Sequence, residues 1–424
     1  MRILLYGINY PPDLTGIGKY SGEMAEWLAA RGHDVRVVTA PPYYPDWRVR
    51  ADYSGVSYSR EIKGGVMVYR CPLWVPERPT GLKRILHLAS FALSSLPVVL
   101  YQVRWRPEVV WVVEPPLFCA PGALLAARVC NAKAWLHVQD FEVDAAFDLG
   151  LLKSGWLRHL VLAGERLLLK QFDRVSTISQ RMLDRLNKKA VLGSRCYLFP
   201  NWVDTEEIAP VQRESAGQIG RNAYRNELGI SEHAVVVLYS GNMGNKQGLE
   251  ILAETAQMIQ GQRGLKPCNQ KLAAEVVFVF CGNGSGRVEL EDACEGLANV
   301  IFLDLQPSER LGEFLGMADI HLLPQRADAA DLVMPSKLTG MLASGRPVVA
   351  TAVAGTQVAE AVAERGRVVP PGDAAALALA VAELASNPAE RATLGRAARD
   401  YAVKHWNREI VLVEFEQQLS SVLE

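Results

Sequence analysis

The chain has 424 residues, 49% of them hydrophobic and 21% charged, and a formal net charge of -1 at pH 7. This length is large for one hydrophobic core, so two domains are expected, and the balanced charge excludes a basic field for nucleic acid. The seven cysteines are dispersed, with no CxxC pair and no Cys/His cluster of zinc spacing. This pattern favours a reduced, cytoplasmic protein and predicts no metal site.

The N-terminal segment predicts a strand, a loop, a helix and a second strand. Arg2 to Ile8 is a short apolar strand, and its apolar run is too short for a signal peptide. The loop from Asn9 to Gly18 is rich in proline and glycine, a helix is expected from about Lys19 to Arg31, and Val35 to Thr39 is the next strand. This order is typical of doubly wound α/β domains.

The segment from Ile85 to Val103 contains no Asp, Glu, Lys or Arg and approaches the length of a membrane span. His87, three serines and Pro97 dilute its apolar character, and Pro97 would kink a helix. Basic residues flank both ends. Two interpretations stay open, a core helix or a helix that lies on the inner face of the cytoplasmic membrane, whereas a full span is disfavoured.

The rest of the chain alternates strands and helices in two halves, with a polar boundary at residues 210–220. We therefore predict an α/β fold of two doubly wound, Rossmann-like domains that face a cleft, residues 1–205 and 221–404, and a C-terminal helix, 405–424, that can cross back to the N-terminal domain. The expected strands of the two halves are 65–69, 109–113, 134–138, 175–178 and 197–199, then 235–239, 276–280, 300–303, 320–323 and 348–350.

Ligands of such domains lie at the carboxyl ends of the strands, where several candidates occur. Gly16 and Gly18 follow the first strand, and glycine allows close approach of a diphosphate to the backbone; a tight turn is the alternative. With Gly22, their spacing misses the dinucleotide fingerprint by one residue, and no acidic residue follows the second strand. A nicotinamide cofactor is therefore disfavoured.

His137 ends another strand and is followed by Asp140, Glu142 and Asp144. An imidazole with nearby carboxylates can bind sugar hydroxyls or position an acceptor, although a lone strand histidine is more often structural.

Glycines also follow two strands of the second half. Gly241 opens the run SGNMGNKQG, whose Lys246 can neutralise a leaving phosphate, and Gly282 and Gly284 form a turn that suits a base or a ribose. No DxD motif occurs in the chain. This favours neutralisation by lysine and helix ends over a metal-held diphosphate.

The stretch from Asp331 to Thr351 predicts a loop, a helix and a buried strand. Pro335 can open the helix, and Ser336 and Lys337 then lie where unpaired backbone N–H groups point outward. Such a helix start is suited to phosphate, whereas an ordinary helix–strand connection with an accidental lysine is the alternative.

Together these stretches resemble glycosyltransferase family 4, which has the GT-B fold. The resemblance covers nearly the whole chain and rests on NYPPDLTGIGKYSGEMAEWLAARGHDVRVVTAPPYYP, HVQDFEVDA, the PNW turn, SGNMGNKQGLE and PSKL...LASGRPVVA. It implies a retaining transferase that needs no metal or cofactor and uses a nucleotide-diphosphate sugar, GDP-linked in preference to UDP-linked. The implied acceptor is a lipid-linked oligosaccharide of colanic-acid-like exopolysaccharide synthesis, with fucose as a candidate sugar and a peripheral contact with the inner membrane face.

The resemblance also assigns residues by position. The N-terminal domain would bind the acceptor and the C-terminal domain the donor. Gly16 and Gly18 match the loop near the donor diphosphate, His137 the histidine that contacts the transferred sugar, Lys246 the phosphate lysine, and Ser336 and Lys337 the diphosphate contacts. The catalytic candidates are His137, Asp140 and Lys246, and the donor candidates are Gly16, Gly18, Gly241, Lys246, Gly282, Gly284, Ser336 and Lys337.

Two departures from the family pattern affect the donor site. Asn242 stands where many members have an arginine, and Leu332 and Gly340 occupy the places of a carboxylate pair whose second member holds the ribose. No ribose carboxylate is therefore assigned. Two alternatives also stay open: a nucleotide-sugar epimerase or hydrolase of the same fold, using Glu142 or Asp144, and a non-catalytic nucleotide-sugar-binding protein.

Overall fold

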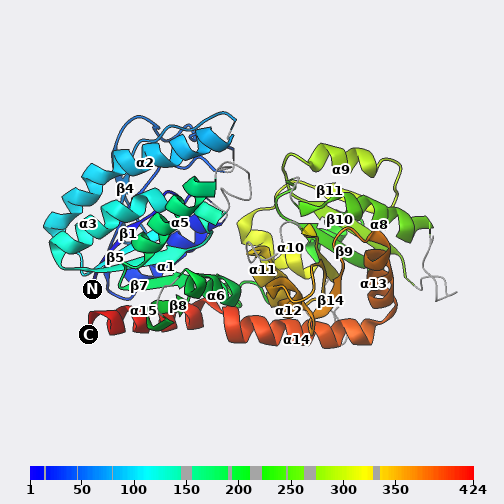
Figure 1. The fold of residues 1–424 in the computed structure, drawn as a ribbon. Helices are drawn as coiled ribbons and strands as arrows, with labels where there is room; N and C mark the ends of the chain where they lie inside the picture. Colours follow the sequence, from blue (N-terminus) through cyan, green and yellow to red (C-terminus); the bar gives the residue numbers. More distant parts are fainter. Residues whose placement is uncertain are drawn as a thin grey trace. The chain divides into compact units, whose positions relative to one another are not determined.

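The computed structural model shows two compact units, which are described separately (Figure 1). The first unit comprises Met1–Pro200 with Val411–Glu424, and the second comprises Asn201–Ile410. The structure describes residues 1–13, 16–44, 46–78, 80–144, 155–189, 193–210, 222–244, 247–261, 274–327 and 335–424.

The first unit is built on an eight-stranded sheet in the order β3-β4-β2-β1-β5-β6-β7-β8. Its strands are parallel except for β3, which pairs antiparallel with β4 at the edge. All six residues of β5 are buried, as expected for a central strand covered on both faces. The strands are β1 Arg2–Tyr6, β2 Asp34–Thr39, β3 Ser59–Lys63, β4 Val66–Arg70, β5 Val109–Glu114, β6 Lys133–Val138, β7 Arg174–Thr177 and β8 Cys196–Leu198.

Helices connect these parallel strands. Ser179 caps one of them, α6, because its hydroxyl accepts a hydrogen bond from the Met182 N–H at 3.3 Å. The helices are α1 Ile17–Ala30, α2 Gly81–Gln102, α3 Ala120–Cys130, α5 Gly155–Leu169 and α6 Gln180–Lys188.

The second unit contains a six-stranded parallel sheet in the order β11-β10-β9-β12-β13-β14. Side chains alternate along β9, so Val236 and Leu238 enter the core on one face and Val235, Val237 and Tyr239 the core on the other. The strands are β9 Val235–Ser240, β10 Val276–Cys281, β11 Val300–Leu303, β12 Ile320–Leu323, β13 Val348–Thr351 and β14 Gly366–Val369.

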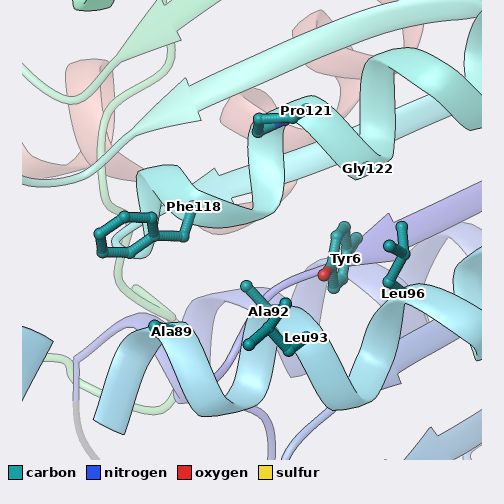
Figure 2. Close-up of a pocket in the computed structure, with 8 residues that line it drawn as sticks. All are labelled: Tyr6, Ala89, Ala92, Leu93, Leu96, Phe118, Pro121 and Gly122. Atoms are coloured by element: carbon teal, nitrogen blue, oxygen red, sulfur yellow. The ribbon is translucent and has the colours of Figure 1, made fainter. Parts of the chain in front are cut away.

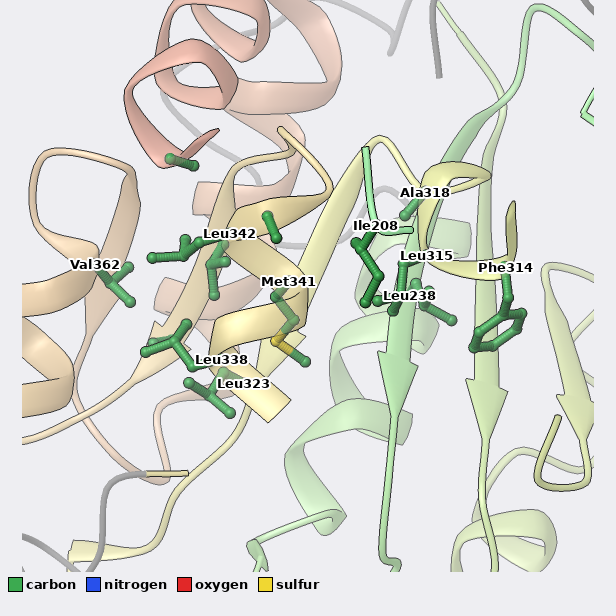
Figure 3. Packing of buried hydrophobic residues seen from close by; sticks show 14 of the residues in the cluster. Ile208, Leu238, Phe314, Leu315, Ala318, Leu323, Leu338, Met341, Leu342 and Val362 are labelled. Atoms are coloured by element: carbon green, nitrogen blue, oxygen red, sulfur yellow. The ribbon is translucent and has the colours of Figure 1, made fainter. Parts of the chain in front are cut away.

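Each face of this sheet is covered by its own set of helices. Figure 3 shows the core around α11, where Met341 lies on the side of Ile208 and Leu342 on the side of Val362. The opposite face is covered by α8, α9 and α13. The helices are α7 Ala223–Glu227, α8 Glu250–Gly261, α9 Arg287–Ala293, α10 Leu311–Gly316, α11 Lys337–Ala343, α12 Gln357–Val362, α13 Ala374–Ser386 and α14 Pro388–Trp406.

The last helix, α15 (Arg408–Leu423), packs on the first unit. Phe415 is 1% exposed, and its ring centroid lies 4.7 Å from that of Trp111 and 4.4 Å from that of Phe199. Glu416 accepts hydrogen bonds from Arg31 and His33, both at 2.8 Å. The predicted C-terminal helix thus lies against the N-terminal sheet.

The limits of the units differ by a few residues from the boundaries expected from sequence. Residues 201–205, expected in the first domain, belong to the second unit, because Val203 bridges to Asn407 and the Thr205 carbonyl accepts a hydrogen bond from Arg399 at 2.6 Å. The segment that joins the first unit starts at Val411 and not at residue 405, because α14 continues to Trp406.

Removal of the Phe415 ring should destabilise the first unit. We expect Phe415→Ala to lower the free energy of unfolding by about 3–5 kcal/mol, because it leaves a cavity between Trp111 and Phe199. Urea denaturation followed by tryptophan fluorescence measures this directly. Ile410→Ala on the same helix is the control, since that side chain is 43% exposed, and its effect should stay within about 0.5 kcal/mol. Equal effects of the two substitutions would contradict this packing role.

Candidate functional site

Two glycine turns meet at the carboxyl edge of the second unit's sheet. Gly241 follows β9 and Gly282 follows β10, and the Gly241 N–H donates a hydrogen bond to the Cys281 carbonyl at 3.0 Å. A Cβ built on Gly282 would lie 1.9 Å from the Gly241 carbonyl oxygen, and one on Gly284 would lie 2.6 Å from the Met243 carbonyl oxygen. Only glycine permits this backbone contact, so no side chain at position 282 separates the two turns.

Lys337 reaches this edge from the first residue of α11. Its Nζ lies 4.3 Å from the centroid of the Tyr239 ring, and its Cδ lies 3.3 Å from the point where a Cβ on Gly241 would be. The residue is half-buried, but its Nζ is shielded from solvent and has no hydrogen-bond partner among the described residues. Burial lowers the pKa of Lys337 to about 7. A buried amine whose pKa is lowered therefore lies beside the Gly241 turn.

Ser336 is exposed and directly precedes α11, and its side chain makes no capping hydrogen bond. The helix has seven residues, Lys337–Ala343. A helix this short contributes little field beyond its first turn. Lys337 thus carries the formal positive charge at this position, and the contact of Ser336 and the helix start with a diphosphate stays a prediction.

Some donor-site candidates lie outside the described residues. These are Lys246, in the loop after Gly241, and Leu332, which stands at the first carboxylate position. The role of Lys246 stays a prediction.

Gly340 lies on α11, away from the strand ends. It is buried, and a Cβ built on it would lie 3.2 Å from Leu315 Cδ1 and 3.7 Å from Ile208 Cδ1. Figure 3 shows both side chains next to the helix. The position faces an apolar core, so a carboxylate there would be buried against hydrocarbon.

In the first unit, His137 lies at the end of β6 and is 4% exposed. Its Nε2 accepts a hydrogen bond from the Gln139 amide at 2.9 Å, so Nδ1 donates to Ser176 Oγ, also at 2.9 Å. The ring stacks on Trp111 with centroids 5.2 Å apart. Burial lowers the pKa of His137 to about 3, which keeps the imidazole neutral. Both ring nitrogens are therefore occupied within the protein, and its contact with a sugar stays a prediction.

Carboxylates gather just beyond His137. Burial raises the pKa of Asp140 to about 6, and the Arg84 charge partly opposes this rise. The Leu117 N–H donates to Glu142 Oε2 at 2.7 Å, and the Glu142 N–H donates to Glu114 Oε1 at 3.3 Å. Burial, then the charges of Glu142 and Glu165, raise the pKa of Glu114 well above its ordinary value. The Glu142 carboxylate thus connects the segment after β6 to Leu117, which follows β5.

Asp144, the other acidic candidate, is held by two cations. Lys189 Nζ lies 3.2 Å and Arg185 3.6 Å from Asp144 Oδ2. Lys189 also pairs with the buried Glu165 at 2.5 Å. This buried network escaped the sequence analysis, because its members lie far apart in the chain.

The first glycine loop is shaped by Asp13. Gly16 has φ +61° at the start of α1, and a Cβ built on Gly18 would lie 2.9 Å from Asp13 Cβ. Asp13 is 4% exposed, its Oδ1 has no hydrogen-bond partner among the described residues, and burial raises its pKa to about 6. Gly18 is thus needed for packing of the loop, and the contact of Gly16 and Gly18 with a diphosphate stays a prediction.

The described residues contain no group of three or more His, Cys, Asp or Glu side chains that could hold a metal ion. The structure thus gathers Gly241, Gly282, Gly284 and Lys337 at one edge of the second unit, and His137 and Asp140 at the end of β6 in the first.

Both units match known protein families. Residues 15–202 match the family described as a glycosyl transferase 4-like domain, and residues 234–387 match glycosyl transferases group 1. The chain is 43% identical over 423 residues to WcaI of Escherichia coli K12, which carries the name of a colanic acid biosynthesis glycosyl transferase, and the match covers 98% of each chain. The chain belongs to glycosyltransferase family 4.

Solved structures show the same fold. Sucrose-phosphate synthase from Thermosynechococcus elongatus superposes with a TM-score of 0.73 at 20% identity, covering 100% of this chain and 99% of that one. Anabaena HepE, solved in complex with UDP, superposes with a TM-score of 0.69 at 15% identity, covering 99% and 100%. The fold is GT-B, and the protein is a glycosyltransferase related to WcaI. This assignment sets aside a non-catalytic binding protein.

Substitution of Gly282 should disrupt the paired turns. We expect Gly282→Ala to cost about 2–5 kcal/mol, because its φ of +147° disfavours alanine and the new Cβ would collide with the Gly241 carbonyl. Gly372→Ala is the matched control, since φ is +78° and no atom lies within 4 Å, and it should cost only about 1–2 kcal/mol. Thermal unfolding compares the two, and equal losses would contradict the close contact.

Substitution of Gly340 tests whether a ribose carboxylate can be restored. We expect Gly340→Glu to lower the free energy of unfolding by about 3 kcal/mol or more, because the charge would be buried between Leu315 and Ile208. Gly340→Ala should change it by less than about 1 kcal/mol, since helix propensity favours alanine. Melting temperatures measured with and without nucleotide distinguish loss of stability from a restored contact with the ribose. Unchanged stability with tighter nucleotide binding would show that the glutamate reaches a ribose.

Proposed function

We propose that the enzyme is a retaining, metal-independent glycosyltransferase that uses a GDP-linked sugar, with fucose as the candidate sugar. Its acceptor is a lipid-linked oligosaccharide of a colanic-acid-like exopolysaccharide. The observation that carries the proposal is Lys337, whose shielded Nζ stands beside the Gly241 and Gly282 turns. The relation to WcaI supports the pathway. UDP is the alternative nucleotide, as it is bound to HepE.

The glycine turns and Lys337 fit a diphosphate in complementary ways. The turns allow oxygen atoms to approach backbone N–H groups without obstruction by a Cβ. The lysine supplies charge at the moment when the bond between the anomeric carbon and the diphosphate oxygen breaks. One preorganised contact of this kind lowers the barrier by about 2.7–4 kcal/mol. The oxygen of the acceptor hydroxyl then forms the new glycosidic bond at the same carbon, and the hydroxyl proton passes to the departing diphosphate. Lys246 is assigned to the same leaving group.

A lipid-linked acceptor is supported by the surface of the first unit. The helix from Gly81 to Trp105 is long and apolar enough to cross a membrane, and a third of its most apolar window is buried. Its exposed side chains include Leu82, Leu86 and Leu93. A second apolar surface follows α5, where Trp156, Leu160 and Leu167 are exposed.

These α5 side chains lie four and seven positions apart, which places them on one stripe of the helix. Exposed apolar stripes flanked by basic residues suit a membrane surface. We therefore assign the enzyme to the cytoplasm and the inner face of the cytoplasmic membrane, as a peripheral protein.

Nucleotide binding should depend on the charge of Lys337. We expect GDP to raise the melting temperature without magnesium, and Lys337→Met to abolish most of this rise. Because the pKa of Lys337 is about 7 before binding and a bound diphosphate raises it, binding should take up a proton above pH 7. Affinity should fall by up to about tenfold per pH unit from pH 7 upward. Calorimetry in buffers of different ionisation enthalpy measures the proton uptake.

The same experiment contains its control. In Lys337→Met the dependence of affinity on pH above 7 should disappear, whereas a general effect of pH on the fold would remain. No stabilisation by GDP or UDP would contradict the donor site. Incubation of the donor sugar without an acceptor distinguishes the alternative reaction: rapid epimerisation or hydrolysis would identify a nucleotide-sugar epimerase or hydrolase instead of a transferase.

A further inference from the structure

The groove between α2 and α3 in the first unit is unsuited to a charged group (Figure 2). Figure 2 shows that its lining comes from both helices, with Leu93, Leu96 and Phe118, and from Tyr6 at the end of β1. The Tyr6 hydroxyl, the polar atom seen there, is hydrogen-bonded to Ser95 Oγ at 2.6 Å. The side chains that line this groove in the described part of the chain carry no charge. It is therefore no second site for a diphosphate, which needs cations.

A second basic residue, Arg326, lies at the carboxyl edge of the second unit's sheet. β12 lies between β9 and β13, and the three strands are parallel. Arg326 follows the last residue of β12, Leu323, by three positions and is exposed. Because the carboxyl ends of parallel strands share one edge of the sheet, Arg326 leaves the sheet at the same edge as Gly241, which follows β9. Lys337 reaches this edge from α11.

The backbone directly before Arg326 is fixed to the sheet. The Gln325 N–H donates a hydrogen bond to Thr351 Oγ1 at 2.8 Å, and the Thr351 hydroxyl donates one to the Gln325 carbonyl at 2.9 Å. Thr351 is the last residue of β13 and is 0% exposed. One buried hydroxyl thus satisfies both backbone groups of Gln325. This anchor preorganises the position from which the Arg326 side chain starts.

The stem of Arg326 lies against a glycine of the donor-side loop. Gly248 has φ +67°, and a Cβ built on it would lie 3.1 Å from Arg326 Cγ and 3.8 Å from the Arg326 nitrogen. Gly248 is the last residue of the run SGNMGNKQG, in which Gly241 is the first glycine. A side chain at position 248 would crowd the arginine stem, so the glycine leaves room for it. Lys337 thus contacts the start of this loop, and Arg326 contacts its end.

The two cations differ in how they hold their charge. Burial lowers the pKa of Lys337 to about 7, so the free amine loses its proton as the pH rises above 7. A guanidinium keeps its proton throughout this range and can donate two parallel hydrogen bonds to a phosphate. Asn242, which stands where many family members have an arginine, carries no charge. Arg326 therefore supplies a permanent positive charge that neither Lys337 nor Asn242 provides.

We propose that Arg326 is a second donor-binding cation, which contacts the diphosphate of the nucleotide sugar together with Lys337. The proposal rests on the proposed function and adds to the donor site a residue from β12, the strand next to β9. In this assignment the charge that is missing at Asn242 comes from the neighbouring strand end. The enzyme then keeps part of its affinity for the donor above pH 8, where Arg326 stays charged.

Calorimetric titration of the full chain with GDP tests the role of Arg326. At pH 8, Arg326→Met should weaken binding by about tenfold or more, because a charge-assisted contact with the diphosphate is lost. Arg326→Lys keeps the charge but not the planar fork, so its loss should be smaller, about threefold. GDP and UDP share the diphosphate, so the loss should be equal for either nucleotide that binds. The melting temperature without nucleotide should stay unchanged in both variants, since the side chain is exposed.

Arg396→Met is the matched control. Arg396 is exposed on α14 and follows Gly395, which packs against Gly345 near the start of β13. This position belongs to the opposite edge of the sheet, because β13 begins there and ends at the donor side. Removal of this charge should therefore change GDP affinity by less than about twofold.

Proton uptake distinguishes a direct contact from an effect through Lys337. In Arg326→Met, uptake of a proton with GDP at pH 8 should persist, because Lys337 is still present. In Lys337→Met the uptake should disappear, whereas Arg326 should retain a residual affinity for GDP. Calorimetry in two buffers of different ionisation enthalpy measures this difference.

The outcomes separate this proposal from the donor site as a whole. The proposal is overturned if Arg326→Met binds GDP as tightly as Arg396→Met. It is also overturned if Arg326→Met loses proton uptake along with affinity, since Arg326 would then act only by placing Lys337. Weaker binding in Lys337→Met without an effect of Arg326→Met would contradict Arg326 alone and leave the donor site in place. A wild type that binds neither GDP nor UDP would contradict the donor site and this proposal together.

Discussion

The contact between the backbone turns at Gly241 and Gly282 is the constraint on which the carboxyl edge of the second unit's sheet depends. The Gly241 carbonyl fills the space where any other residue at position 282 would carry its Cβ. This contact brings the ends of β9 and β10 together without side chains between them, and it exposes backbone where Lys337 arrives from α11. A bulkier residue at position 282 would push the turns apart and change the distance between Gly241 and Lys337. The chemistry assigned to this edge is therefore a consequence of two missing side chains.

The two units use their buried polar groups differently. In the second unit, the Nζ of Lys337 is shielded from solvent, and burial lowers the pKa of Lys337 to about 7. In the first unit, His137 is already satisfied by Gln139 and Ser176, and Glu142 by the Leu117 backbone. These groups shape loops at the strand ends. One edge thus carries a buried amine without a hydrogen-bond partner among the described residues, whereas the polar groups at the other edge are bonded to one another and to the backbone.

Much of the architecture could be predicted because buried parallel strands are continuous apolar runs. Strands such as Val300–Leu303 and Ile320–Leu323 were found with their bounds. The edge strand Ser59–Lys63 was missed, because SREIK is mostly charged and has no apolar pattern. Sequence also found Lys337 and the strand-end glycines, since their residue types suit phosphate. It could not show that Gly340 faces Leu315, that Asp13 packs against Gly18, or that Lys189 joins Asp144 to Glu165, because each contact depends on tertiary packing.

The position of α15 also bears on synthesis of the chain. The aromatic cluster of the first unit, with Trp111, Trp135 and Phe199, is closed by Phe415. At about 5–20 residues per second, the ribosome reaches Phe415 roughly 10–40 s after Phe199. Trp111, Trp135 and Phe199 therefore lack the contact with Phe415 until the whole second unit has been synthesised. During synthesis, the aromatic cluster of the first unit can therefore close only after Phe415 has been added.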